Sequence, residues 1–80
     1  MSNTSDYPKE YFVKIDGNDF LEIRLEVNLL SGPRPYCVEI NIVQKNSNKI
    51  YQHLKTLYGY YDEEESLREA NHFIANYKSS

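Results

Sequence analysis

The sequence predicts an α+β domain of two layers, in which a four-stranded antiparallel meander carries one C-terminal helix on one face, in the order ββββα. Apolar and polar residues alternate through residues 20–43, on either side of a proline-containing turn. This pattern is typical of two half-buried antiparallel strands. Residues 62–78 instead place apolar side chains three and four positions apart, which indicates an amphipathic helix.

The length of the chain limits it to a single domain. Eighty residues form one folded unit, and we expect a flexible polar arm over residues 1–8 and the α+β domain over residues 9–80. A chain this short buries only about 60–65% of its unfolded surface. Small domains without disulfides often gain stability by self-association, and the single cysteine excludes an intramolecular disulfide.

The first strand and the start of the second are predicted to form a tight hairpin. Residues 11–16 alternate in polarity and are followed by a Gly-Asn-Asp tip, which suits a turn. Pairing Val13 with Ile23 matches the apolar faces of the two strands. The same register places Lys14 opposite Glu22, a favourable cross-strand pair.

The second and third strands form the next predicted hairpin, with residues 30–35 as its loop. Matching Val27 with Val38 aligns their apolar faces. This register also places Glu26 beside Glu39, which is unfavourable. We therefore expect either that Arg24 reaches diagonally to relieve the repulsion or that a bulge shifts the register.

Residues 50–61 are ambiguous between a strand and a helix. A strand continues the meander and suits the Tyr, Ile and Thr content, so four strands are predicted; the alternative is three strands plus two helices. As a strand, the segment would turn Ile50, Leu54 and Tyr58 toward the core. It would also place His53 opposite Glu39 on the outer face of the sheet.

The helix over residues 62–78 begins with a capping signal. Asp62 is the expected N-cap, and Glu65 stands three residues later, as in a capping box. One helix must then cover the apolar face of the sheet. The predicted core comprises Val13, Ile15, Leu21, Ile23, Leu25, Val27, Val38, Ile40, Ile42, Leu54, Leu67, Ala70, Phe73 and Ile74.

No residue combination predicts catalysis, a cofactor or a metal site. The acidic run at residues 62–65 is interpreted as the charge that a helix N-terminus favours, because consecutive carboxylates on a helix point in different directions. His53 and His72 lack zinc-ligand spacing and are expected at the surface. Glu26 and Glu39 are expected to raise the pKa of the Cys37 thiol, which disfavours a nucleophile.

The sequence favours a non-enzymatic cytoplasmic protein that binds another protein, as an adaptor, regulator or inhibitor. Large apolar groups on the outer sheet face, together with a tyrosine-rich corner before the helix, suggest a protein partner or a homodimer. No stretch is long enough to span a membrane. The candidate partner-binding surface comprises Phe12, Phe20, Arg24, Glu39, Tyr51, His53, Tyr58, Tyr60 and Tyr61.

Nucleic-acid binding is the alternative function. It would use the open sheet face and basic loops, with Phe12 and Tyr51 as stacking platforms. The net charge of −3 argues against it, because a phosphate-backbone binder needs a clustered basic field. The lysines and arginine available for it are Lys9, Lys14, Arg24, Lys45, Lys49 and Lys55.

Overall fold

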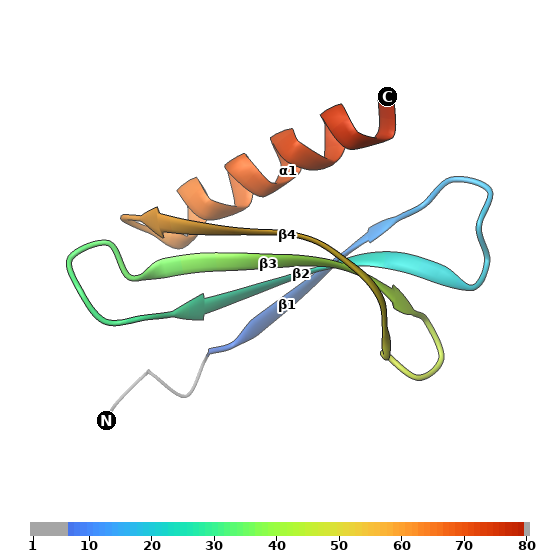
Figure 1. The fold of residues 1–80 in the computed structure, drawn as a ribbon, viewed down its shortest axis with the longest axis horizontal. Coiled ribbons are helices and arrows are strands. Elements are labelled where there is room, and N and C mark those ends of the chain that lie inside the picture. The colour runs from blue at the N-terminus through green and yellow to red at the C-terminus, as the bar shows by residue number, and fades with distance from the viewer. Residues whose placement is uncertain (1–6, 80) are drawn as a thin grey trace.

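The computed structural model describes residues 7–79, with side chains as far as residue 77, and has the predicted ββββα order (Figure 1). One antiparallel sheet contains the strands in sequence order, and α1 packs on one of its faces. The strand interpretation of residues 50–60 is therefore confirmed. The elements are β1 (Lys9–Lys14), β2 (Leu21–Leu29), β3 (Tyr36–Gln44), β4 (Ile50–Tyr60) and α1 (Glu63–Ser79).

Both predicted hairpin registers are confirmed. Val13 lies opposite Ile23 in the β1–β2 ladder, and Val27 lies opposite Val38 in the β2–β3 ladder. β1 begins at Lys9, two residues before the predicted start. Residues 1–6 of the predicted arm lie outside the described residues, whereas Tyr7, which was predicted to belong to that arm, packs against the core.

The β4 strand departs from simple alternation. Its ladder with β3 shifts register at three places, and each extra residue reverses which side chains face the core. The prediction that Ile50, Leu54 and Tyr58 face inward is therefore only partly right. Leu54 packs against the core, but Ile50 and Tyr58 are exposed, and Leu57 packs inward as well.

The core lies between α1 and the sheet. Ala70 and Ile74 are buried apolar residues of α1, and they pack against the buried side chains of β2 and β3. Every predicted core residue is buried there or packs against it. Three further aromatic and aliphatic side chains join them, namely Tyr7, Tyr36 and Leu57.

The predicted capping interaction fixes the start of α1. The backbone N–H of Glu65 donates to Asp62 Oδ1 at 2.8 Å, and Glu65 Oε1 accepts from the backbone N–H of Tyr61 at 3.0 Å. These bonds satisfy amide groups that a helix N-terminus leaves without intrahelical partners. The loop from β4 into α1 is therefore locally fixed.

The central strand β3 is largely buried on both faces, although α1 covers only one. Figure 1 shows α1 on one side of a strongly twisted sheet. On the other side, Cys37, Asn41 and Val43 are nevertheless buried. Side chains of β2 and β4 flank this strand on both sides and cover it. The expectation that Cys37 and Val43 add exposed apolar area to this face is therefore wrong.

Candidate interaction surface

The sheet face opposite α1, hereafter the open face, carries a line of three carboxylates. Glu10 of β1 lies opposite Glu26 of β2, and Glu26 lies opposite Glu39 of β3. Directly opposed side chains in a sheet have Cβ atoms about 4.5–5.5 Å apart. These three residues, hereafter the carboxylate row, therefore concentrate negative charge across three neighbouring strands.

Arg24 partly neutralises one end of the carboxylate row. Its Nη1 lies 3.8 Å from Glu10 Oε2 and its Nη2 lies 3.5 Å from Glu26 Oε1. The predicted compensation of Glu26 by Arg24 is thus confirmed. The residue is only 8% exposed, and its buried Nε has no hydrogen-bond partner among the described residues. Arg24 therefore stabilises the carboxylates from beneath and offers little surface of its own to a partner.

The third carboxylate, Glu39, is held by a hydrogen-bond network with Asn41 and His53. Asn41 Nδ2 donates to Glu39 Oε2 at 2.9 Å, and Asn41 Oδ1 lies 2.8 Å from His53 Nδ1. Because an amide oxygen only accepts, His53 Nδ1 carries the proton in this arrangement. His53 lies directly opposite Asn41 and not Glu39, which corrects the predicted register, since β4 gains an extra residue here. Asn41 is fully buried, so it orients both neighbours.

Exposed aromatic rings stand around this charged centre. Phe12 is 47% exposed beside Arg24, and Tyr58 lines a shallow hollow together with Cys37 and Glu39. At one end of the sheet, Phe20 and Tyr51 are still more exposed and line a second hollow with Lys45. These rings provide apolar contact area without closing a pocket around the carboxylates.

Two of the predicted partner-binding tyrosines lie elsewhere. Tyr60 is half-buried, and its pKa is raised by burial and by Glu69 and Glu65 of α1, so it lies toward the helix side. Tyr61 is exposed in the turn before α1, where the Arg34 guanidinium lies 4.7 Å from its ring centroid. The nine predicted residues therefore do not form one continuous patch.

Cys37 is unsuited to nucleophilic chemistry. The thiol is buried, and its Sγ lies 3.7 Å from the backbone oxygen of Asn28. Burial is the main cause of the raised pKa of Cys37; the backbone contact with Asn28 lowers this pKa, and Glu39 and Glu26 raise it by smaller amounts. The predicted direction is confirmed, although burial and not charge is the main cause.

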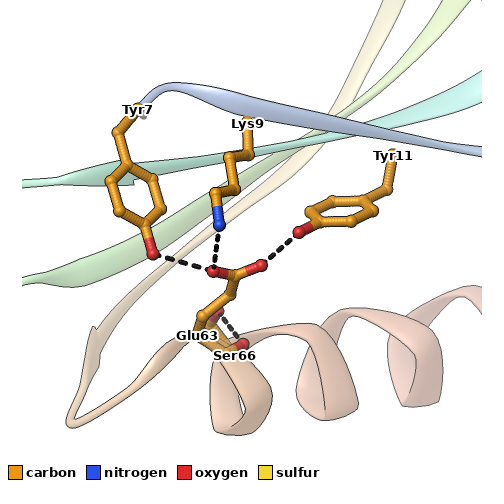
Figure 2. Close-up of polar contacts among 5 residues, drawn as sticks. All are labelled: Tyr7, Lys9, Tyr11, Glu63 and Ser66. Atoms are coloured by element: carbon orange, nitrogen blue, oxygen red, sulfur yellow. Dashed lines mark hydrogen bonds and ion pairs between the residues drawn. The ribbon is translucent and has the colours of Figure 1, made fainter. Parts of the chain in front are cut away.

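A second cluster joins the N-terminal segment to α1. Glu63, in the first turn of the helix, accepts hydrogen bonds from Tyr7 at 2.7 Å, from Lys9 at 3.3 Å and from the Tyr11 hydroxyl (Figure 2). Ser66 Oγ donates to the Glu63 backbone oxygen at 2.7 Å. We call the contacts of Tyr7, Lys9 and Tyr11 with Glu63 the Glu63 clasp.

Charge and hydrogen bonding explain the pKa values in the Glu63 clasp. The pKa of Glu63 is lowered most by the hydrogen bond from the Tyr11 hydroxyl, and then by those from the Tyr7 hydroxyl and the Lys9 ammonium. Partial burial opposes this by raising the pKa. The same carboxylate raises the pKa of Tyr7 and of Tyr11, because it favours their protonated forms. The clasp is thus a stable arrangement of an ionised acid with protonated phenols at neutral pH.

The described residues contain no group of three His, Cys, Asp or Glu side chains placed to hold a metal ion. The carboxylate row is therefore not such a group either. No helix in the same part of the chain is long and apolar enough to cross a membrane. No family model matches the sequence, and no curated protein or solved structure is significantly similar to it. Function is therefore inferred from the chemistry of the surface itself.

The sequence interpretation placed Glu26 beside Glu39 but missed the third member of the carboxylate row, and it missed the Glu63 clasp entirely. The carboxylate row could have been found, because extending the predicted register by one outward-facing pair places Glu10 opposite Glu26. The Glu63 clasp joins residues up to 56 positions apart, and no periodic pattern encodes that contact. Only the alternation of residues 11–16, which turns Tyr11 to the same face as Val13, points toward it.

Proposed function

We propose that this protein is a small non-enzymatic interaction module whose open face binds a lysine- or arginine-rich segment of a partner protein. The observation that carries the proposal is the carboxylate row, which crosses three strands on a face that α1 leaves uncovered. The sheet register keeps the Cβ atoms of these three residues close together. A cationic segment laid across them would replace their mutual repulsion with attraction.

The exposed side chains suit a protein partner. Glu39 has no arginine or lysine within ion-pairing distance among the described residues; its contacts are with Asn41 Nδ2 at 2.9 Å and His53 Nδ1 at 3.9 Å, both through Oε2. Its side chain is 43% exposed and can therefore reach a partner. Phe12 and Tyr58 flank the row and offer the aromatic contacts that are enriched in protein interfaces. The proposed partner therefore combines basic side chains with apolar ones.

Nucleic-acid binding has weaker support. Two of the six basic residues that it would use are already engaged, because Lys9 binds Glu63 and Arg24 lies between Glu10 and Glu26. The carboxylate row would also repel a phosphate backbone on the same face. We therefore place the protein partner first and keep nucleic acid as an arm of the test.

The pKa directions support a role without catalysis. Glu63 has a lowered pKa, whereas Cys37 and the tyrosines Tyr7, Tyr11 and Tyr60 have raised ones. Each shift moves the pKa of the group away from neutral pH, whereas general acids, bases and nucleophiles need pKa values near neutral pH. A cytoplasmic location remains a prediction that rests on the single free cysteine.

The test measures binding of labelled peptides by fluorescence anisotropy. A peptide with alternating lysine and tyrosine should bind at low salt and weaken as salt rises. Replacing Glu10, Glu26 and Glu39 together with glutamine should weaken the affinity by about tenfold, since each exposed ion pair contributes roughly 0.5 kcal/mol. The control replaces Glu64 and Glu69 of α1, which are exposed and lie on the helix, and the two variants are compared by the loss of affinity per charge removed.

Three outcomes would contradict the proposal. One is the absence of binding to basic peptides at low salt. Another is an equal loss of affinity per charge removed in the open-face variant and the α1 control, which would mean that net charge alone matters. The third is tighter binding of single-stranded nucleic acid than of the peptide under the same conditions, which would favour the alternative function.

A further inference from the structure

The sheet has two edges, and only one of them is regular. β4 forms one edge, and its ladder with β3 shifts register at three places. Bulges of this kind discourage the addition of another strand. β1 forms the other edge, and its ladder with β2 runs from Lys9 to Lys14 without a shift. The backbone groups of β1 that point away from β2 can therefore accept a further strand.

The side chains of β1 are self-complementary. On the open face they follow the order Glu10, Phe12, Lys14, which is an acid, an aromatic ring and a base at alternate positions. When such a strand pairs with an antiparallel copy centred on Phe12, each Glu10 lies opposite Lys14 of the second copy. The two Phe12 rings then meet at the centre, and on the other face Tyr11 lies opposite Val13 of the second copy.

We infer that two copies of this chain pair through β1 in this register and join their four-stranded sheets into one continuous sheet. The symmetry axis passes through Phe12, so both ends of the new ladder gain an ion pair between Glu10 and Lys14. Phe12, which is 47% exposed in the single chain, becomes covered by its copy. The partner is identified by charge complementarity, because this strand fits itself.

Neighbouring registers are less favourable. Centring the pair on Tyr11 places Glu10 opposite Phe12 of the second copy, and centring it on Val13 places Glu10 opposite Asp16. The first leaves a carboxylate against an aromatic ring, and the second sets like charges together. A shift by a single residue would bring core-facing side chains against outward-facing ones. The register centred on Phe12 is therefore selected by charge and by polarity.

The rest of the fold leaves this edge accessible. α1 packs against β2, β3 and β4, and Figure 1 shows it running along the β4 side of the sheet. The Glu63 clasp holds Lys9 and Tyr11 on the helix side of β1, which leaves Glu10 and Lys14 on the open face. Lys14 has no salt bridge among the described residues, and the only one that Glu10 makes is the 3.8 Å contact with Arg24.

This inference rests on the edge of the sheet, although Glu10 and Phe12 also belong to the surface proposed for the cationic partner. Dimerisation is measured without any peptide, so its failure is distinguishable from a failure of the proposed function. Sedimentation velocity from low micromolar to several hundred micromolar concentrations tests it on the full chain. The wild type should form a dimer. Lys14→Glu should weaken the dimer by about tenfold, since it sets like charges together at both ends of the ladder. The double variant Glu10→Lys with Lys14→Glu should restore it.

In the double variant the contacts within one chain are less favourable than in the wild type, because Glu10→Lys also removes the ion pair with Arg24, so restored dimerisation can come only from the contact between copies. Lys14 lies opposite Glu22 in its own sheet, so Lys14→Glu creates the same internal repulsion in the single and in the double variant. Circular dichroism checks that both fold. Lys49→Glu, in the loop between β3 and β4, is the matched charge control and should leave the dimer unchanged. A monomeric wild type, a dimer insensitive to Lys14→Glu, or no restoration in the double variant would overturn the inference.

Discussion

Replacing Glu63 by glutamine should destabilise the fold at neutral pH and leave it unaffected in acid. Hydrogen bonds to charged groups each contribute about 1.5–3 kcal/mol to folding when they are buried. The Glu63 side chain is 22% exposed and that of Lys9 is 39% exposed, so water replaces part of this stabilisation. Glutamine also keeps one acceptor oxygen. We therefore expect Glu63→Gln to lower the free energy of unfolding by about 1.5 kcal/mol.

The effect should depend on pH with a definite sign. The Glu63 clasp lowers the pKa of Glu63 in the folded protein, so its stabilisation is complete above the unfolded pKa of about 4.3 and is lost as the pH falls through the folded value. A protonated glutamic acid resembles glutamine. The difference in stability between wild type and Glu63→Gln should therefore shrink toward zero in acid, while other carboxylates affect both proteins alike.

Urea unfolding followed by circular dichroism, at neutral pH and in steps down to about pH 3, measures this difference. Thermal unfolding should show a Tm lowered by roughly 6–12 °C at neutral pH, because each kcal/mol shifts the Tm of a domain this size by about 4–8 °C. Glu64→Gln is the matched control, since Glu64 is exposed in the same turn and takes part in none of the hydrogen bonds or salt bridges of the Glu63 clasp. Equal destabilisation by both substitutions, or a difference that stays constant with pH, would refute the reasoning.

Three further substitutions or reactions test other parts of the structure. Asp62→Ala should lower the free energy of unfolding by about 1 kcal/mol, because it removes the 2.8 Å hydrogen bond from the Glu65 backbone N–H to Asp62 Oδ1 that caps α1. Urea unfolding measures this loss, and an unchanged stability would mean that the cap is unimportant. Gly59→Ala should cost about 1 kcal/mol, since Gly59 has a φ of +84° and open space around it; Gly59→Asn should cost less, and the reverse order would contradict this explanation. Cys37 should react with a thiol reagent at neutral pH much more slowly when folded than in urea, because burial raises its pKa, and equal rates would show that the thiol is accessible.

The fold was predictable because this sequence places its apolar residues with few exceptions. Val13, Val27 and Val38 fix two registers, since a shift by one residue would expose every apolar side chain of a strand. The helix was equally clear, because Asp62 and Glu65 mark its start independently of its apolar stripe. In these elements, local pattern and long-range packing require the same arrangement.

The β4 strand shows where this reasoning reaches its limit. A period of two assumes that every residue keeps its place in the ladder, and the extra residues of β4 break that rule three times. His53 consequently lies opposite Asn41. Tyr58, which was expected to face the core, is exposed, and Leu57 packs inward instead. The sequence carries no strong signal for these bulges. Gly59, with its positive φ, is the one glycine in β4, and it marks only one of the three positions.

The candidate surface was predicted in part. Phe12, Glu39 and His53 do lie on the open face, as expected from their parity. Arg24 has the right parity but is buried, because the sheet places it between two carboxylates that it neutralises. Exposure depends on what neighbouring strands cover, and parity alone does not determine that.

The Glu63 clasp also bears on how the chain folds as it is synthesised. Tyr7 and Glu63 are separated by 56 positions, so β1 leaves the ribosome well before α1 and cannot be held by it during that interval. Contacts between distant segments close long loops and tend to form late. β1 therefore acquires its final attachment only when α1 has formed, and until then it is the strand most open to pairing with another nascent chain.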